Sequence, residues 1–362
     1  MFDFSSFLSN KAFITEDHHV YTYADLLGLS ERFSEHLVPR SLIFIGCENS
    51  LESIVAYVSC LRSGVVPLLL SRDVPDETLY HLEAIYHPRY CWFPSRRDLL
   101  VKGKEKYSLG GYSLIQYDGD SPVLPEGLAL LLTTSGSTGS PKLVRLSHDN
   151  LKSNACSIIE YLKITSSEKA ITSLPMYYSY GLSVLNSHLL AGATLLLTDK
   201  SYVQREFWKF VLEEKATSFA GVPFTYEILK KMRFEKFLPS SVKVMTQAGG
   251  KLNSSLIKYF SEYARLHDIR FYVMYGQTEA TARMSYLPAE YTLNKVGSVG
   301  VAIPGGHFSL IDEDGMRIVS PNVEGELVYE GSNVFWGYAE SLDDLFKGDE
   351  NKGILYTGDL AY

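Results

Sequence analysis

Residues 128–142 read LALLLTTSGSTGSPK, an apolar strand followed directly by a loop of Thr, Ser, Gly and Pro that ends in a lysine. Glycine lets the backbone adopt positive φ and approach a ligand closely. Successive free N–H groups and hydroxyls form a concave anion site, to which the lysine adds a point charge. We therefore predict a polyphosphate-binding loop that contains Thr133, Thr134, Ser135, Gly136, Ser137, Thr138, Gly139 and Lys142.

The spacing within this loop excludes two common motifs. A Walker A loop requires Gly-x-x-x-x-Gly-Lys-Ser/Thr, but here Pro141 follows Gly136 at the fifth position, and Leu143 stands where Ser or Thr would hold a metal. A nucleophile elbow requires Gly-x-Ser-x-Gly, and this loop has none. For such a loop taken alone, a solvated Ser/Gly linker is the alternative. The apolar strand before it and a helical pattern from His148 favour a ligand site.

The composition indicates a globular protein with a large core. Of the 362 residues, 46% are apolar and 21% are charged, and the formal net charge is −8. No basic excess points to nucleic acid or a membrane surface. Cys47 and Cys60 lie among apolar residues, which indicates buried free thiols in a reducing compartment. We see neither a signal peptide nor an apolar run that could span a membrane, and we expect a cytoplasmic enzyme.

Strand-like and helical segments alternate along most of the chain. An apolar strand at 41–46, a helix at 51–61 and a second strand at 65–70 begin the series. It resumes after residue 142 and includes a helix expected at 183–190. This β-α-β-α rhythm predicts mostly parallel sheets covered by helices. Past Leu287, glycines separate short β-rich runs, which indicates a small β-barrel or β-meander.

Four segments occur in the order found in the adenylate-forming superfamily, which includes acyl-CoA synthetases, luciferases and peptide-synthetase adenylation domains. The loop resembles the family's phosphate-binding signature. Three further segments resemble motifs of the family. YGQTEA at 275–280 is similar to aromatic-Gly-x-Thr-Glu, and GEL at 325–327 to Gly-Glu-Leu. YTGDLA at 356–361 is similar to Tyr-x-Thr-Gly-Asp-x-Ala. Each motif alone is weak, but four in order are strong. With a similar opening at 21–26, the resemblance covers essentially the whole chain.

The resemblance implies an α/β fold with two mostly parallel sheets in αβαβα layers. We expect residues 1–290 to form two intertwined α/β subdomains that bind ATP and the acyl substrate. Residues 291–362 would form a barrel-like β subdomain that carries Asp359. Family members continue past the position of Tyr362 into a mobile C-terminal domain with a catalytic lysine. We therefore expect this sequence to be a fragment of a longer protein rather than a natural truncation. We also expect the fragment to be poorly active by itself.

The implied reaction is attack by a carboxylate on the α-phosphorus of ATP, with release of pyrophosphate. Two anions must meet, so the site needs positive potential and Mg²⁺. By resemblance, Thr278 meets the α-phosphate, Glu279 binds Mg²⁺, and Lys142 acts with the phosphate loop. Adenine and ribose would contact Gly249, Gly250, Tyr275, Gly276 and Asp359. The ordinary alternatives are a solvated acid for Glu279, a core aromatic for Tyr275, and turn residues for Asp359 and for the Gly249–Gly250 pair.

The segment LPMYYSYG at 174–181 is similar to the family's Leu-Pro-x-x-His-x-x-Gly, which borders the acyl pocket. Tyr178 replaces the usual His or Phe, and we expect Tyr178 and Tyr180 to line the pocket; a Tyr-rich turn packed on the core is the alternative. No acid occurs between Leu174 and Leu190 to pair with a substrate ammonium, and a buried unpaired ammonium is unfavourable. We therefore expect an acid with a neutral tail.

The sequence thus predicts the N-terminal domain of an AMP-forming acid–thiol ligase. Its partners would be a small carboxylic acid and a thiol acceptor, either coenzyme A or the phosphopantetheine of an acyl carrier protein, with no nucleic acid and no membrane span. The alternatives are an amino-acid adenylation domain and a non-catalytic nucleotide- or acyl-binding module.

Overall fold

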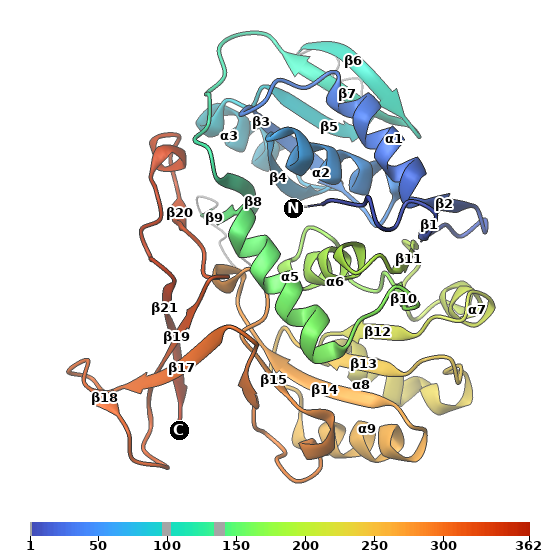
Figure 1. Ribbon diagram of the computed structural model, residues 1–362, viewed down its shortest axis with the longest axis vertical. Coiled ribbons are helices and arrows are strands. Elements are labelled where there is room, and N and C mark those ends of the chain that lie inside the picture. Colours follow the sequence, from blue (N-terminus) through green and yellow to red (C-terminus); the bar gives the residue numbers. More distant parts are fainter. Residues whose placement is uncertain (1, 96–102, 134–141) are drawn as a thin grey trace.

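The computed structural model describes residues 2–95, 103–133 and 142–362, which form two large sheets, a small third sheet and the helices around them (Figure 1). The predicted phosphate-loop residues Thr134, Ser135, Gly136, Ser137, Thr138 and Gly139 lie outside the described residues.

The first large sheet has eight strands in the order β20-β9-β8-β4-β3-β5-β7-β6. Its centre is parallel and its edges are antiparallel. Thr133 of β8 and Leu143 of β9 are paired across the two strands, so the residues between them connect neighbouring strands. The strands are β3 (Leu42–Cys47), β4 (Val66–Ser71), β5 (Tyr90–Pro94), β6 (Gly103–Leu109), β7 (Tyr112–Tyr117), β8 (Leu128–Thr133), β9 (Leu143–Ser147) and β20 (Gly337–Ala339).

The second large sheet has nine strands in the order β16-β15-β14-β13-β12-β10-β11-β1-β2. Strands β1 and β10 to β14 run parallel, with antiparallel strands at both edges. Its strands are β1 (Lys11–Ile14), β2 (Val20–Thr22), β10 (Lys169–Ile171), β11 (Thr194–Leu196), β12 (Ser218–Gly221), β13 (Val244–Gln247), β14 (Arg270–Tyr275), β15 (Ser285–Leu287) and β16 (Val301–Ala302).

Helices separate and cover the two sheets, as the resemblance predicted. Helices α1 (Tyr23–Ser34), α2 (Leu51–Ser63), α5 (His148–Leu162) and α6 (Ser179–Leu190) form the middle layer. The hydroxyl of Tyr57 on α2 donates to Asn186 on α6 at 3.0 Å, which joins the two halves inside one core. The outer layers are α3 (Asp76–Tyr86) on the first sheet and α7 (Arg205–Glu213), α8 (Pro223–Met232) and α9 (Ser254–Leu266) on the second.

Local sequence explains where the middle helices begin. Thr22 and Asp25 form a capping box at the start of α1, and Ser147 and Asn150 form another at α5; such boxes satisfy helix N–H groups that have no partner within the helix. Helix α6 begins at Ser179, earlier than the segment beginning at Ser183 that the sequence suggested, and its start has no side-chain cap. This early start places Tyr180 on the helix.

The third sheet is antiparallel, with the order β18-β17-β19-β21. It is open, because β18 and β21 form its edges, and this corrects the barrel-like shape that we expected. Two further short strands of this region, β16 and β20, pair with the larger sheets; the domain division at residue 290 stays a prediction. The strands are β17 (Gly306–Ile311), β18 (Arg317–Ile318), β19 (Gly325–Gly331) and β21 (Ile354–Ala361).

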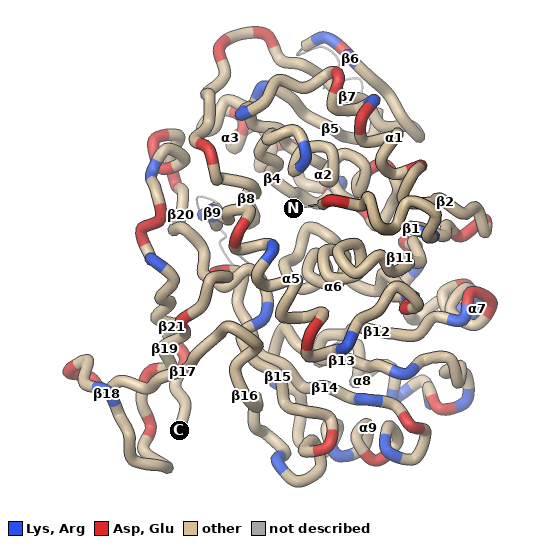
Figure 2. The backbone as a smooth tube through the Cα atoms, viewed as in Figure 1, with Lys and Arg blue, Asp and Glu red and all other residues tan. Residues whose placement is uncertain are grey.

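Lys, Arg, Asp and Glu residues are mixed along α7 and α9 (Figure 2). On α7, Lys209 lies 3.7 Å from Glu213, one turn away.

Cys47 and Cys60 are buried free thiols, as predicted, and burial raises the pKa of each. Among the described residues, no helix combines the length and the apolar character needed to cross a membrane.

Candidate active site

The predicted nucleotide residues gather where β14 ends. The hydroxyl of Tyr275 donates to the Asp359 carboxylate at 2.5 Å, although 84 residues separate them in sequence. The amide of Gln277 donates to the same carboxylate oxygen at 2.9 Å and to the Thr357 carbonyl at 3.0 Å. Burial, followed by the bond to Asp359, raises the pKa of Tyr275. The exposed Asp359 carboxylate is therefore held in a fixed orientation.

The turn after Tyr275 has room only for glycine at its first position. A Cβ on Gly276 would lie 1.8 Å from the carbonyl oxygen of Ala282, which is far inside van der Waals contact. The close approach brings the chain back on itself, so that Thr278 follows at the carboxyl edge of the sheet. Its hydroxyl lies 3.1 Å from that of Ser179, the first residue of α6.

Glu279 and Lys142 both contact Tyr338. The hydroxyl of Tyr338 donates to Glu279 Oε1 at 2.8 Å, and Lys142 Nζ lies 3.7 Å from the centre of the Tyr338 ring. Lys142 Nζ is also 3.7 Å from the Glu340 carboxylate. Burial raises the pKa of Tyr338, and the neighbouring Glu279 adds to the rise. Tyr338 thus connects the predicted metal-binding acid to the lysine at the end of the predicted phosphate loop.

A buried arginine fixes the strand that carries Tyr338. The guanidinium of Arg145 on β9 is fully buried and donates to the Tyr338 carbonyl at 3.2 Å. It also pairs with the Glu350 carboxylate and donates to the Gly348 carbonyl at 3.2 Å. Because Lys142 directly precedes β9, the same strand anchors Lys142 and the segment around Tyr338.

The glycine pair expected near adenine lies at the carboxyl end of β13. Gly249 and Gly250 are exposed and have φ of 78° and 149°, values that suit residues without a Cβ. The side-chain amide of Gln247 donates to the Gly250 carbonyl at 2.8 Å. The pair occupies the same edge of the sheet as Tyr275, where ligands of open α/β sheets bind.

The two tyrosines expected in the acyl pocket differ in position. Tyr178 precedes α6, is 52% exposed, and has its ring 4.8 Å from that of Tyr177. Tyr180 is buried, and its hydroxyl lies 2.8 Å from the Thr246 hydroxyl. Burial raises the pKa of Tyr180 to about 12. Of the pair, Tyr180 has the contacts expected of a residue beside an internal pocket.

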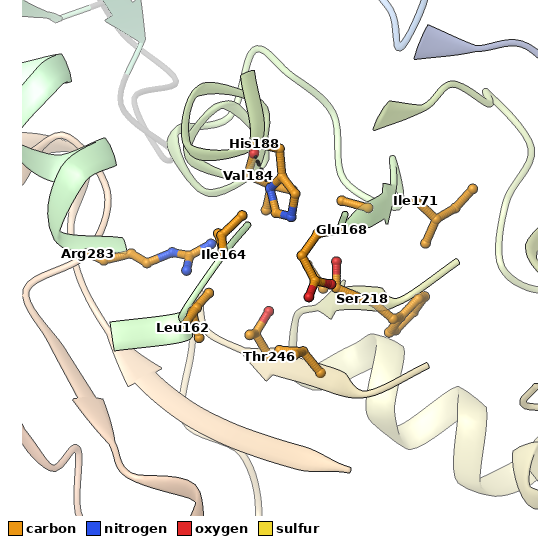
Figure 3. Close-up of a pocket in the computed structure, with 13 residues that line it drawn as sticks. Leu162, Ile164, Glu168, Ile171, Val184, His188, Ser218, Thr246 and Arg283 are labelled. Carbon is orange, nitrogen blue, oxygen red and sulfur yellow. Dashed lines mark hydrogen bonds between the residues drawn. The ribbon is translucent and has the colours of Figure 1, made fainter. Parts of the chain in front are cut away.

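A small pocket, with about 20 Å³ of space for water-sized groups, lies between α6 and the second sheet (Figure 3). Val184 and His188 line it from α6, and side chains of β10, β12 and β13 line it from the sheet. His188 and Arg283 are buried polar residues on its wall. The lining residues are Leu162, Ile164, Glu168, Ala170, Ile171, Val184, His188, Ser218, Phe219, Ala220, Val244, Thr246 and Arg283.

The two-sheet fold and the match to a known family place the chain among the adenylate-forming enzymes, and Tyr275, Thr278, Glu279 and Asp359 lie near the carboxyl end of β14 in this fold. The chain belongs to the AMP-binding enzyme family, whose match covers residues 6–339. It corresponds to the N-terminal domain of an AMP-forming acyl-CoA synthetase-like ligase.

Two curated relatives illustrate the extent of the match. The 2-succinylbenzoate–CoA ligase of Bacillus cereus is 32% identical, over 99% of this chain and 75% of that protein. The enzyme of the same name from Bacillus mycoides is 31% identical, over 64% of this chain and 47% of that protein.

Solved structures share the fold. The N-terminal domain of FACL13 from Mycobacterium tuberculosis has a TM-score of 0.81 at 18% identity, with 99% of this chain and 94% of that chain covered. O-succinylbenzoate coenzyme A synthetase (MenE) from Bacillus subtilis, in complex with ATP and magnesium, has a TM-score of 0.77 at 23% identity. That comparison covers 98% of this chain and 74% of the synthetase.

Sequence reasoning missed four residues that the structure brings to this region: Ser179, Gln277, Tyr338 and Arg283. Gln277 occupies the variable position of the YGQTEA motif, and Ser179 lies inside the acyl-pocket segment, so both could have been examined. Tyr338 has no sequence signal, because its role depends on the pairing of β20 with β9. Arg283 lies just beyond the Thr-Glu motif.

Proposed function

We propose that this chain binds ATP and Mg²⁺ and activates a small carboxylic acid as an acyl-adenylate, which is then transferred to a thiol. The main support is the gathering of Thr278, Glu279 and the Tyr275–Asp359 pair around one turn at the end of β14. This edge of an open α/β sheet is where ligands bind.

Each residue has a distinct part in the proposal. Asp359, held by Tyr275 and Gln277, accepts hydrogen bonds from the ribose hydroxyls, and the glycine pair after β13 leaves room for adenine. The Thr278 hydroxyl, positioned against Ser179, donates to an α-phosphate oxygen and so stabilises the charge that builds up there. Lys142 neutralises part of the charge on the β- and γ-phosphates, to which the Ser and Thr hydroxyls after Thr133 donate hydrogen bonds.

The chemistry of Glu279 suits Mg²⁺. One of its carboxylate oxygens accepts from Tyr338, and no hydrogen bond from a described residue reaches the other. The described residues contain no cluster of three His, Cys, Asp or Glu side chains that could enclose a metal. Mg²⁺ commonly binds one or two carboxylates together with substrate phosphates and water. Bound there, it would neutralise phosphate charge and polarise the phosphorus for attack.

Coenzyme A is the proposed thiol acceptor, since the curated relatives are named CoA ligases; a carrier-protein phosphopantetheine is the alternative. The relatives' name also makes 2-succinylbenzoate the first acid to test. Thiol ligation with coenzyme A and ATP suits the cytoplasm, which is the location that we propose.

The proposal is tested by pyrophosphate release from ATP with the full-length protein. Fatty, aryl and hydroxy acids, 2-succinylbenzoate and the standard amino acids are compared by kcat/KM. An organic acid should give the highest value, and Glu279→Gln should abolish most of it. A highest value for an amino acid would favour the adenylation-domain alternative, and release with no acid at all would contradict the proposal.

A further inference from the structure

Thr281 has a strained backbone conformation and follows closely after the Thr278–Glu279 pair. Its φ of 67° and ψ of −50° place a β-branched residue in the positive-φ region, where such residues are genuine outliers. The Ala282 amide donates to the Ala280 carbonyl at 2.7 Å, so Thr281 is the central residue of a γ-turn of the rare, strained kind. Strain of this sort persists only where the surrounding structure enforces it.

The side-chain amide of Asn333 holds this turn from both sides. Its Nδ2 donates to the Ala280 carbonyl at 2.8 Å and to the Arg283 carbonyl at 3.2 Å, one before the strained residue and one after it. The Thr281 hydroxyl in turn donates to the backbone carbonyl of Asn333 at 2.7 Å. Thr281 and Asn333 are 6% and 3% exposed, so a polar group that loses its partner here would stay buried and unpaired.

A tyrosine of the third sheet determines which way the Asn333 amide points. The hydroxyl of Tyr329, a fully buried residue of β19, donates to Asn333 Oδ1 at 2.8 Å. An amide whose oxygen accepts this bond presents its two N–H donors to the turn. The third sheet therefore reaches the strained turn through Tyr329 and Asn333.

The segment at 333–338 also fixes Glu279 at two points. The Phe335 amide donates to the Glu279 backbone carbonyl at 2.8 Å, and the Tyr338 hydroxyl donates to its carboxylate. The side-chain amide of Asn150 on α5 anchors the same segment, because it donates to the Val334 carbonyl at 2.8 Å. The segment that holds the strained turn thus also holds the backbone and the side chain of Glu279.

The turn determines the direction of the two side chains that precede it. The Thr281 amide donates to the Thr278 carbonyl at 2.9 Å and so closes the 3-10 helix η2 (Thr278–Ala280), which carries both Thr278 and Glu279. A Thr281 that relaxed to negative φ would redirect the chain after η2 and disturb this closing bond. Groups that stabilise developing charge act best when they are held in place before the reaction begins.

We propose that Asn333 is a positioning residue of the acid-activating reaction: it keeps Thr281 strained and so holds Thr278 and Glu279 in the orientation that stabilises the transition state. The inference rests on the proposed function and adds to it a residue that contacts neither nucleotide nor metal. The competing explanation is that Asn333 only pairs buried carbonyls and contributes stability. The two explanations differ in the activity of a variant that stays folded.

The test uses the full-length protein and measures acid-dependent pyrophosphate release from ATP, the affinity for adenosine, and the midpoint of urea denaturation. Asn333→Ala should lower kcat roughly tenfold or more, because misplaced groups lose transition-state stabilisation. Its affinity for adenosine should be unchanged, since adenosine has no phosphate to meet Thr278. Asn186→Ala is the matched control: this buried amide accepts from the Tyr57 hydroxyl, and its loss should lower the urea midpoint without changing kcat.

Substitutions at two further positions test the same contact independently. Thr281→Val keeps the branched shape and removes the hydroxyl bond to Asn333, so it should lower kcat as well. Thr281→Ser keeps the hydroxyl and should retain most of the activity. Tyr329→Phe is the mildest change, because it removes only the group that orients the Asn333 amide, and it should lower kcat less than Asn333→Ala does.

The outcomes separate the inference from the proposed function. A folded Asn333→Ala protein with the kcat of the wild type would overturn the inference, as would equal activities of Thr281→Val and Thr281→Ser. If Asn333→Ala and Thr281→Val do not fold, Tyr329→Phe decides, and an unchanged kcat in that variant overturns the inference. Turnover of any acid by the wild type keeps the proposed function whatever the variants do, whereas no turnover contradicts both.

Discussion

The hydroxyl of Tyr338 donates a hydrogen bond of 2.8 Å to Glu279, and the same ring lies under the Lys142 ammonium at 3.7 Å. One side chain therefore orients both an anion and a cation of the proposed site. Its neutral form is favoured, because burial and Glu279 raise its pKa.

Tyr338→Phe separates these two contacts, because it removes the hydroxyl and keeps the ring. We expect Glu279 to lose its orientation, at a cost of about 1.5–3 kcal/mol for a hydrogen bond to a charged group. The Mg²⁺ concentration for half-maximal pyrophosphate release should rise. Tyr356→Phe, at a position that is 63% exposed, is the matched control and should change nothing. An unchanged Mg²⁺ dependence in Tyr338→Phe would remove Tyr338 from the site.

Asp359→Ala should weaken nucleotide binding by about 1–3 kcal/mol, since a charge-assisted acceptor is lost. Calorimetry with ATP and with AMP measures the change. Gln277→Ala should have a smaller effect in the same direction, because it removes one of the two groups that hold the carboxylate. Equal affinities of the wild-type and Asp359→Ala proteins would argue against the ribose role.

Gly276→Ala should lower the free energy of unfolding by about 1–3 kcal/mol or more, the range for overpacking. The added Cβ would meet the Ala282 carbonyl at 1.8 Å. Gly28→Ala is the control, because Gly28 lies inside α1 with nothing within 4 Å of the added atom. That change should stabilise the protein by about 0.5–1 kcal/mol. Urea denaturation of both variants gives the comparison, and a neutral Gly276→Ala would refute the close approach.

His188 should make stability depend on pH below neutrality. Its pKa falls from 6.5 to about 4 on burial, so the unfolded chain takes up a proton before the folded chain does. The stability that the neutral His188 ring provides is therefore present above pH 6.5. As the pH falls from 6.5 toward 4, the free energy of unfolding decreases by about 1.4 kcal/mol per pH unit. The difference in unfolding free energy between wild type and His188→Leu, measured by urea denaturation from pH 7 to pH 5, should show this slope. A difference independent of pH would contradict it.

The sequence predicted the layers of the fold well, because they depend on short-range patterns, whereas the nucleotide roles of the motif residues stay predictions. Alternating apolar strands and helices determine the parallel centres of the sheets, and the family's motifs give Tyr275, Thr278, Glu279 and Asp359. The YGQTEA motif ends before Arg283, so the resemblance assigned that residue no role. Its burial depends on contacts with Tyr161 of α5, Tyr180 of α6 and Met274 of β14.

Other parts could not be predicted from local sequence. The antiparallel strands β6, β7 and β9 are selected by pairing with distant partners rather than by their own composition. The early start of α6 includes Tyr180 and Gly181, which are weak helix formers, so packing in the middle layer must stabilise that first turn. The open third sheet likewise depends on which strands pair, and glycine spacing gives no information about closure.

The pairing of Thr133 with Leu143 has an entropic consequence. When the ends of a chain segment already lie next to each other, ligand binding between them causes no further loss of loop-closure entropy. The entropic cost of closing a longer segment grows only slowly with its length. The position of Lys142 is fixed from the β9 side, through Arg145 and the strand that carries Tyr338. Evolution or design could therefore change the length of the segment between β8 and β9 without moving Lys142.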